Sequence, residues 1–275
     1  MGRVAVKYQQ AIYAKSEPRE SLTMSDPYLR QILTRLRVDT GPFSPVRGVQ
    51  AALQPTLQRW AGNSLVSMEP SGSFAKGTAI NGGTDIDIFV SLSSTVTESL
   101  EVIYTTLFNR LRDEGFAPRS QNVSIGTKIG TYSVDIVPAR RQGPTGQFHS
   151  LYRRKAKSWT QTNVISHITT VRNSGRAEEI MIVKAWREQK QLTFPSFYLE
   201  LVTIEACRGR KVGDLSENVW ATLAYIRDSI QTAVFIDPAN TNNRISDDLS
   251  ASEKQALAHA AFTARQATNW KQIVI

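Results

Sequence analysis

The sequence predicts an α+β protein, with a mixed-sheet domain over residues 1–145 followed by a helical domain over residues 146–275. Short runs rich in β-branched residues alternate with helical patterns in the first part, whereas apolar residues recur at helical spacing through most of the second. The 275 residues, 41% of them hydrophobic and 21% charged, are typical of one large globular domain or two modest ones. A fibrous or disordered chain is therefore excluded.

The net charge, the lack of long apolar runs and the single cysteine indicate which partners and which cellular location the sequence favours. Lys plus Arg (33) exceed Asp plus Glu (24), so the formal net charge is +9, which favours anionic partners such as nucleotides, nucleic acid or an acidic membrane surface. No stretch approaches the roughly 20 apolar residues of a membrane-spanning helix, and residues 1–14 lack an apolar core of signal-peptide length. The single Cys207 excludes an internal disulfide and cannot by itself form a zinc site. These observations predict a cytoplasmic protein.

The first ordered elements are predicted to be helices. Residues 1–25 carry little periodicity and are expected to form a loosely held arm. An aspartate cap followed by proline predicts a short helix over 26–36. A longer helix is predicted over 44–62, where apolar residues recur at helical spacing and Pro55 is expected to bend the axis.

The rest of the first domain alternates between strands and helix. Strands are predicted over 65–69, 85–91, 123–129 and 131–137. The last two are joined too tightly for a crossover helix, so we expect them to be antiparallel. Residues 70–83 are predicted to form a glycine-rich loop with a possible helical turn. A helix is predicted to begin at a capping box formed by Thr95 and Glu98 and to end at Gly115.

Helical patterns are expected to dominate from about residue 146. Helices are predicted over 162–173, 176–189, 196–208, 215–232 and 252–269. Between the last two, Asp237-Pro238 and the asparagines that follow have the composition of a turn, with Asn243 as a minor candidate for the site.

Three aspartates on predicted strands form the most informative pattern. Asp85 and Asp87 are two residues apart on one strand, so their side chains point to the same face. Asp135 lies in a second strand flanked by β-branched residues, and it joins them if the two strands are neighbours. Carboxylates crowded on an apolar strand repel one another, and a divalent cation such as Mg²⁺ offsets that cost. Such a site can hold two metal ions about 3.5–4 Å apart for phosphoryl transfer.

The glycine-rich loop before these strands suits a phosphate. Gly72 and Gly77 let the backbone approach a ligand closely, and Ser73 offers both an N–H and a hydroxyl donor. An Asp-x-Asp pair alone is weak, because many surface strands carry one. The loop before it and the aspartate after it make the combination specific.

With these residues the chain resembles the DNA polymerase β-like nucleotidyltransferase superfamily. Residues 72–87, Gly-Ser-Phe-Ala-Lys-Gly-Thr-Ala-Ile-x-Gly-Gly-Thr-Asp-Ile-Asp, are most similar to the bacterial cGAS/DncV-like nucleotidyltransferases (CD-NTases), relatives of oligoadenylate synthase. The likeness continues through Lys184-Ala185-Trp186, the run 195–201 and the run 236–240, and covers about residues 44 to 245. It implies a bilobed molecule with a central cleft between the mixed-sheet domain and the helical domain.

The resemblance also implies roles for individual residues. Gly72 and Ser73 would hold the β- and γ-phosphates of a nucleotide. Two Mg²⁺ ions, for which Mn²⁺ can substitute, would be bound by Asp85 and Asp87, and Asp135 would bind the catalytic ion and help activate the attacking hydroxyl. From the helical half, the triphosphate and base contacts would come from Lys184, Ser196 and Phe197. For Lys184 a solvated helix position, and for Phe197 a core position, remain the competing interpretations.

The function implied is template-independent joining of NTPs or dNTPs, ATP among them, into a cyclic or linear oligonucleotide. That product would switch on an effector protein in anti-phage defence, with pyrophosphate released. The alternative is nucleotide addition to RNA ends, as in CCA-adding or tRNA-modifying relatives, which the net charge favours. A catalytically silent binding module is less consistent with three intact carboxylates, and transfer to a small molecule is less consistent with the motifs of the helical half. Oligomeric state cannot be inferred.

Overall fold

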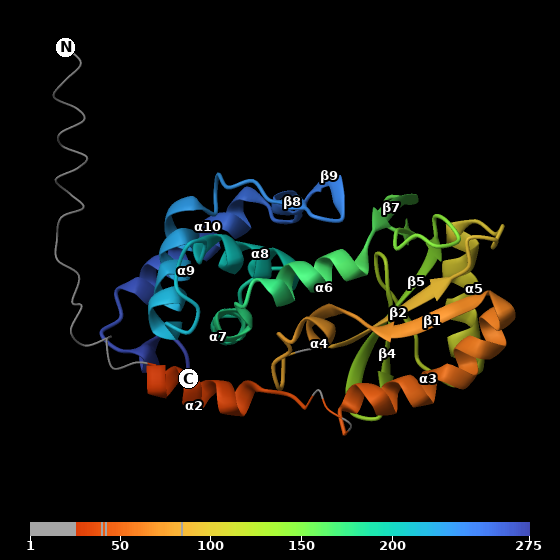
Figure 1. The fold of residues 1–275 in the computed structure, drawn as a ribbon, viewed down its shortest axis with the longest axis horizontal. Coiled ribbons are helices and arrows are strands. Elements are labelled where there is room, and N and C mark those ends of the chain that lie inside the picture. Colours follow the sequence, from red (N-terminus) through yellow and green to blue (C-terminus); the bar gives the residue numbers. More distant parts are fainter. Residues whose placement is uncertain (1–25, 40, 42, 84) are drawn as a thin grey trace, which may run out of the picture.

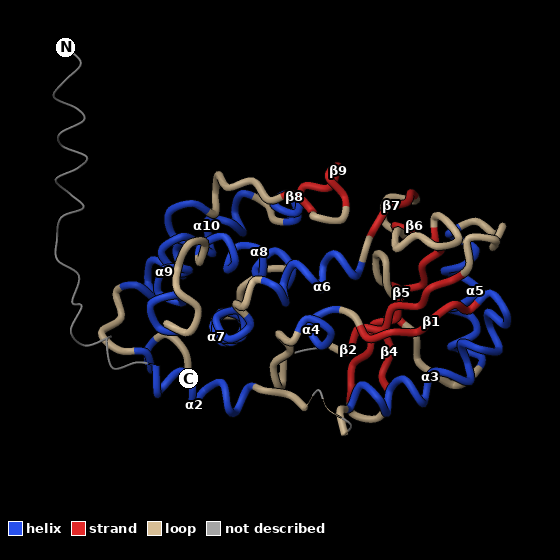
Figure 2. Tube along the Cα trace, in the orientation of Figure 1, coloured by secondary structure: helices blue, strands red, loops and turns tan. Residues whose placement is uncertain are grey.

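In the computed structural model the chain forms two halves that lie side by side. The structure describes residues 26–39, 41, 43–83 and 85–275, so the expected N-terminal arm lies outside the described residues. A sheet with its covering helices forms one half and a bundle of helices the other, with helices α4 (Gly72–Lys76) and α6 (Val164–Asn173) between them (Figure 1, Figure 2). In the described part of the chain, no helix combines the length and the apolar character that crossing a membrane requires.

The sheet brings the predicted aspartate strands together. Five strands are hydrogen-bonded in the order β1-β2-β5-β4-β3, namely Leu65–Pro70, Ile86–Leu92, Tyr132–Arg141, Ile125–Ile129 and Arg119–Ser120. Strands β2 and β5 are parallel, and the other neighbours are antiparallel, including the β4–β5 pair that the sequence predicted. Two more antiparallel strands, β6 (His149–Arg153) and β7 (Ser158–Thr162), continue the sheet from the end of β5.

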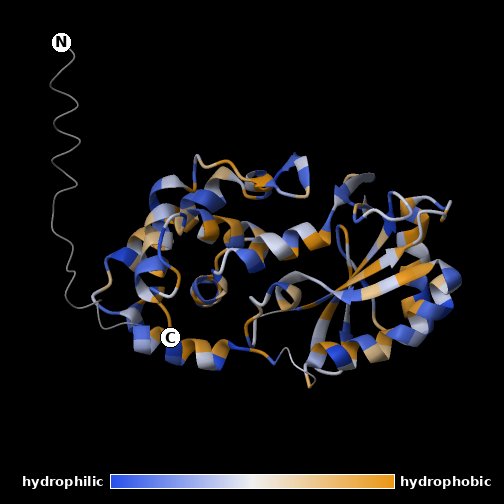
Figure 3. Cartoon of the chain, in the orientation of Figure 1, coloured by the Kyte–Doolittle hydropathy of each residue, from blue (hydrophilic) through white to orange (hydrophobic). Residues whose placement is uncertain are grey.

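Helices α3 (Pro45–Ala61) and α5 (Leu100–Asp113) pack on one face of this sheet. Alternate residues of β2 and β5, such as Ile88 and Ile136, are fully buried beneath them, and the central strands are largely hydrophobic (Figure 3). Because strand side chains alternate in direction, the residues between these positions point to the opposite face. That face carries the aspartates.

The second half is built around helix α7 (Ala177–Gln189), most of whose residues are buried. Helices α8 (Ser196–Ala206), α9 (Leu215–Ser229) and α10 (Ala251–Arg265) share one apolar core with it. Helix α2 (Asp26–Leu36) joins the same core although it precedes the sheet in the chain. Arg30 of α2, and Arg37 directly after it, pair with Glu178 of α7 at 3.1 and 2.6 Å. Short 3₁₀ turns complete the fold at Gly62–Ser64, Ile245–Asp248 and Trp270–Gln272.

Several predicted elements need correction. The helical character expected from about residue 146 is wrong for residues 149–153 and 158–162, which form the strands β6 and β7. The domain boundary at residue 146 stays a prediction. The first helix after β2 is capped by Ser99, whose hydroxyl accepts from the Val102 N–H at 3.2 Å, and not by the Thr95–Glu98 box. Pro55 lies inside α3 without ending it. The predicted turn near residue 237 contains a hairpin of β8 (Ile236–Asp237) and β9 (Asn240–Arg244).

Candidate active site

The parallel pairing of β2 and β5 places two of the predicted carboxylates side by side. Asp87 and Asp135 are direct register partners, on strands whose usual spacing is about 4.8 Å. Asp85 immediately precedes β2, two residues before Asp87, and is exposed. The three aspartates therefore gather at one edge of the free face of the sheet, as the spacing predicted.

The electrostatics of this group are unfavourable without a counter-ion. Burial, together with the charges of Asp135 and Asp85, raises the pKa of Asp87 to about 7. Burial and the charge of Asp85 also raise the pKa of Asp135. The structure thus holds carboxylates close enough to resist one another's ionisation, which is typical of functional sites.

The loop before β2 touches the carboxylates through Gly72. This residue has φ +54, and a Cβ built on it would lie 1.7 Å from Oδ2 of Asp87, so no side chain fits there. The Ser71 N–H donates to the Asp87 carbonyl at 2.8 Å, which fixes the loop to β2. Ser73 follows in α4 and is largely buried. The predicted glycine-rich loop contains the helical turn that the sequence allowed for, α4, whose start lies against Asp87.

A glutamine that sequence reasoning missed holds Asp135. The Gln121 side-chain amide donates to Oδ1 of Asp135 at 2.8 Å, and the Ser124 hydroxyl donates to the Gln121 amide oxygen at 2.6 Å. Gly126, the register partner of Asp135 on β4, leaves room for this contact, since a Cβ there would lie 2.6 Å from Nε2 of Gln121. Gln121 lies fourteen residues from Asp135, in a loop without a motif, so spacing gave no signal.

The donor set fits divalent cations, although it is not arranged as a finished metal site. Within the ranges that the structure describes, no three His, Cys, Asp or Glu side chains are grouped so that they could hold a metal ion. Two observations nevertheless favour a cation at the aspartates: their mutual repulsion, and the backbone at Gly72 that leaves Asp87 space a Cβ would fill. Carboxylate oxygens are the ligands that Mg²⁺ takes.

Two of the helical-half candidates, Lys184 and Ser196, form hydrogen bonds with protein groups other than the aspartates. Lys184 is 1% exposed, and its ammonium donates to Glu200 Oε1 (2.7 Å), Thr78 Oγ1 (3.0 Å) and the Thr78 carbonyl (3.2 Å). Ser196 is exposed, and its hydroxyl accepts from Arg187 at 3.0 Å. The solvated interpretation of Lys184 is therefore wrong.

Phe197 is half-buried between two polar groups. Its ring centre lies 4.4 Å from that of His167 and 4.2 Å from the Lys76 ammonium. His167 in turn pairs with Asp237 at 2.7 Å, and the Asn243 side-chain amide donates to the same carboxylate at 3.1 Å. His167 and Asn243 are thus joined in one cluster beside Phe197. Base stacking by Phe197 stays a prediction.

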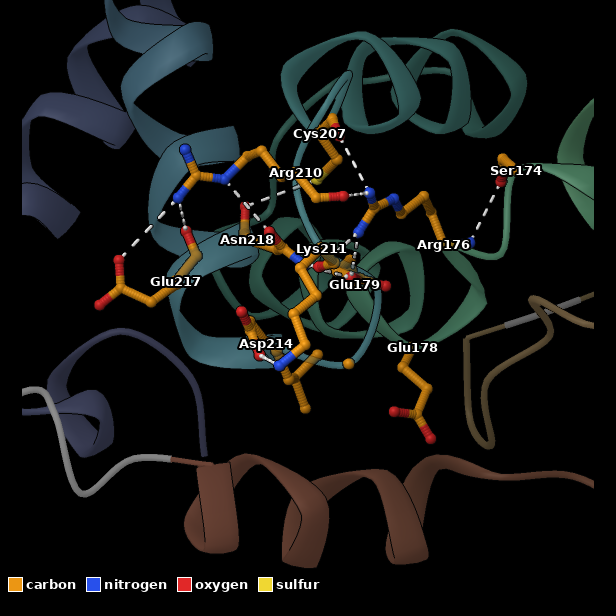
Figure 4. Close-up of polar contacts among 12 residues, drawn as sticks. Ser174, Arg176, Glu178, Glu179, Cys207, Arg210, Lys211, Asp214, Glu217 and Asn218 are labelled. Atoms are coloured by element: carbon orange, nitrogen blue, oxygen red, sulfur yellow. Dashed lines mark hydrogen bonds and ion pairs between the residues drawn. The ribbon is translucent and has the colours of Figure 1, made fainter.

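A second buried polar network lies deeper in the helical half (Figure 4). Arg176 donates to Glu179 at 3.2 Å, and also to the carbonyls of Cys207, Arg210 and Lys211. The Asn218 amide donates to Glu179 at 2.8 Å. We call these contacts of Arg176, Glu179 and Asn218 the scaffold network, because they join α7 to the 207–214 loop and α9. It includes none of the predicted site residues.

Two surface cavities lined by described residues lie away from the aspartates. One of about 580 Å³ is lined by residues of α3 and α5, among them Trp60 and Val102, and includes none of the candidate site residues. Another, of about 590 Å³, is lined by Phe43, Pro45 and Tyr132. The chemistry of the aspartates, not cavity size, identifies the candidate site.

Known proteins share both the sequence pattern and the fold. No family model matches the chain. The cyclic AMP-AMP-AMP synthase of Escherichia coli strain MS 115-1 is 25% identical over an alignment of 244 positions that covers 74% of this chain and 76% of that protein. The solved structure of E. coli MS115-1 CdnC with ATP has a TM-score of 0.72 and 23% identity, covering 90% of this chain and 91% of the other. CdnC has also been solved in complex with HORMA-deltaN.

Two further solved structures have a similar fold at lower sequence identity. The Bradyrhizobium diazoefficiens CD-NTase CdnG, in complex with GTP, has a TM-score of 0.69 and 16% identity over 88% of this chain and 92% of that one. The Cid1 poly(U) polymerase, bound to MgATP, has a TM-score of 0.65 and 13% identity over 88% of this chain and 94% of that one. The expected resemblance to the CD-NTases and the α+β polymerase β-like nucleotidyltransferase fold are confirmed.

Proposed function

We propose that this chain is a template-independent nucleotidyltransferase that joins nucleoside triphosphates into a cyclic or linear oligonucleotide. The observation that carries the proposal is the pairing of Asp87 with Asp135 on adjacent parallel strands, with Asp85 beside them and Gly72 packed against Asp87. The likeness to a cyclic AMP-AMP-AMP synthase supports the same reaction type and makes ATP the first substrate to test.

The aspartates and the Gly72 loop would have different roles in the reaction. Asp85, Asp87 and Asp135 would hold divalent cations, Mg²⁺ or Mn²⁺, whose positive charge stabilises the phosphate charge that develops during transfer. Backbone and hydroxyl donors at Gly72 and Ser73 bind the β- and γ-phosphates. A ribose hydroxyl then attacks the α-phosphorus, a new P–O bond forms, and the bond to the β-phosphate breaks so that pyrophosphate leaves.

Asp135 is the group placed to assist the attacking hydroxyl. Gln121 fixes the orientation of its carboxylate through a hydrogen bond of 2.8 Å, which suits a group that accepts a proton at a defined position. Side-chain hydrogen bonds from Gln121 and Ser124 hold this carboxylate where it would meet the incoming hydroxyl. The same residue therefore serves both cation binding and proton acceptance.

Incubation with each labelled NTP and dNTP, with Mg²⁺ or Mn²⁺ and without nucleic acid, tests the proposal. A phosphatase-resistant product identified by mass spectrometry would mean a cyclic oligonucleotide, and a ladder of phosphatase-sensitive species would mean a linear one. The Asp135→Asn variant is the matched blank, because it keeps the side-chain volume. No product under any of these conditions would refute synthesis without a template.

Nucleotide addition to RNA ends is the second candidate function. The net charge of +9 and the structural likeness to the Cid1 poly(U) polymerase favour it. Activity that appears only when RNA is added would select this alternative. An effector protein that responds to the product, and a role in anti-phage defence, remain predictions.

A further inference from the structure

A basic surface begins beside Asp135 and continues over the turn between β6 and β7. Arg119 of β3 and Asp135 are both register partners of Gly126, one on each side of it, so the three residues share one face of the sheet. Four exposed cationic residues form what we call the basic turn surface: Arg119, Arg154, Lys155 and Lys157. No aspartate or glutamate occurs in the sequence between Asp135 and Glu178, so the turn has no acidic neighbours along the chain.

Hydrogen bonds hold the turn against the loop that follows β3. The backbone N–H of Arg154 donates to the Asn122 carbonyl at 2.8 Å, and that of Lys155 donates to Oδ1 of Asn122 at 3.1 Å. The Arg154 guanidinium donates to the Gln121 carbonyl at 3.0 Å. The cations of the turn are therefore fixed to the same loop that orients Asp135 through Gln121.

The basic turn surface differs from other exposed arginines because no carboxylate neutralises it. Within the described part of the chain none of its four cations forms an ion pair, whereas Arg30, Arg59 and Arg208 all do. Arg153, directly before the turn, is different again, since its charge acts on Asp248 of the helical half. Like charges without counter-charges raise the positive potential of a surface, so this one attracts a polyanion.

An exposed indole lies next to these cations. Trp159 of β7 is 58% exposed and follows Lys157 by two residues. Among the described strands β7 pairs with β6 alone, so the ring lies on an edge strand. An unpaired base stacks on such a ring, and cations combined with an aromatic ring are typical of surfaces that bind single strands. An acidic membrane surface requires an apolar face, which the neighbouring Ala156 and Ser158 do not provide.

We propose that the basic turn surface and Trp159 bind single-stranded nucleic acid, with phosphates on the cations and a base on the indole. This binding needs neither a nucleoside triphosphate nor a divalent cation, so the inference goes beyond the proposed function and holds whichever product the aspartates form. A strand bound there would lie beside the edge of the candidate site, because Arg119 and Asp135 share a face of the sheet.

Fluorescence anisotropy of a labelled oligouridylate tests the proposal on the full chain, in EDTA and without triphosphate so that no synthesis occurs. Lys155→Gln combined with Lys157→Gln is expected to weaken binding at least fivefold. The slope of log K against log salt is expected to become less negative by about 1.4, since each phosphate contact of a single strand contributes roughly 0.7. Trp159→Ala is expected to weaken binding about tenfold with an unchanged salt slope, because stacking releases no counter-ions.

Matched measurements make each outcome decisive. Lys190→Gln combined with Lys271→Gln removes the same charge from exposed positions of the helical half and is expected to leave affinity and salt slope unchanged. An equal loss in this control would reduce the effect to net charge and overturn the proposal. If Trp159→Ala bound as tightly as the parent, or a duplex as tightly as the single strand, the assignment to single strands would be wrong.

A second set of probes separates this inference from its competitors. Binding of phosphatidylserine vesicles in place of the oligonucleotide, lost in the Lys155→Gln and Lys157→Gln variant, would assign the surface to a membrane and overturn the proposal. All the substituted side chains are exposed, so we expect every variant to keep the melting temperature of the parent. A parent that binds no oligonucleotide but makes product from NTPs would refute only this inference, and the reverse result would refute only the proposed function.

Discussion

Two buried ionic groups in the helical half use similar residues in opposite ways. In the scaffold network the Arg176 guanidinium finds one carboxylate and three backbone carbonyls, so its charge and its donors are matched within the protein. In the Lys76–Glu200–Lys184 cluster, one carboxylate serves two ammonium groups beside three crowded aspartates. Buried charge that is matched within the protein organises the fold, whereas crowded like charges mark the place where a ligand belongs.

The largest expected effect follows from neutralising the aspartates. Asp87→Asn combined with Asp135→Asn removes two of the three negative groups, and we expect synthesis to fall by at least about 10³-fold, the scale of losing a major electrostatic element. Product formation from labelled ATP measures it. Glu217→Gln, at the rim of the scaffold network, is the control and is expected to keep full activity. Activity surviving the double substitution would show that the site has been misassigned.

The scaffold network is expected to respond in stability rather than in binding. Glu179→Gln leaves the buried Arg176 without its counter-charge, which we expect to cost about 3 kcal/mol of unfolding free energy. Urea denaturation measures that loss, and calorimetry under folding conditions is expected to give nucleotide affinity within twofold of the parent. If Glu179→Gln lost nucleotide affinity but kept its stability, the scaffold network would be part of the binding site, and the two groups would not differ in role.

Two glycines with positive φ allow the same contrast in the backbone. Gly72→Ala would place a Cβ 1.7 Å from Asp87 Oδ2, so the carboxylate must move and we expect a rate loss of about 100-fold. Gly209→Ala, at φ +72 beside the scaffold network, meets nothing within 4 Å and should cost only about 1 kcal/mol of stability. Kinetics and thermal melts of the pair distinguish them. Equal rates in both variants would mean that Gly72 is not part of the site.

Sequence reasoning reached local features and missed those made by distant contacts. Alternation along one strand predicted that Asp85 and Asp87 share a face, with Asp135 joining them if its strand were a neighbour, and β2 and β5 are indeed paired. The short link predicted the antiparallel β4–β5 pair. Strands β6 and β7 were missed because their polar, basic turn hides the alternation. The sequence did not predict where helix α2 packs, because its contacts are distant in the chain: Arg30 pairs with Glu178, which lies 148 residues later.

The same limit applies to the candidate site. Glycine-rich spacing located Gly72 and Ser73, but Gln121 and Glu200 carry no motif of their own. Glu200 lies in a largely apolar helix, and from the sequence alone an acidic residue in such a helix is expected to face solvent. Only the structure shows its ion pairs with Lys76 and Lys184. Such contacts depend on how the two halves pack, which local patterns do not encode.

The smallest effect concerns the pH dependence of stability without metal. Burial and neighbouring carboxylates raise the pKa of Asp87 to about 7 in the folded state, whereas an unfolded aspartate titrates near 3.8. The folded state therefore binds this proton more tightly, so the cost of ionisation is fully present above pH 7 and disappears below about pH 4. We expect Asp87→Asn in EDTA to be more stable than the parent at pH 8 by about 1 kcal/mol. The gain is small because the three carboxylates titrate as a coupled group, so the repulsion is not carried by Asp87 alone.

The pH series and added Mg²⁺ separate this cause from a simple packing gain. The advantage of Asp87→Asn should shrink as the pH falls from 8 to 5, since the parent then carries its own proton on the site. Mg²⁺ should raise the melting temperature of the parent more than that of the variant, because the cation offsets a repulsion that the variant lacks. Glu179→Gln, whose carboxylate is matched by Arg176, should show neither trend. If the stability advantage of Asp87→Asn were constant across pH and unchanged by Mg²⁺, the aspartates would not repel one another in the folded protein. The distinction between the aspartate site and the scaffold network would then be lost.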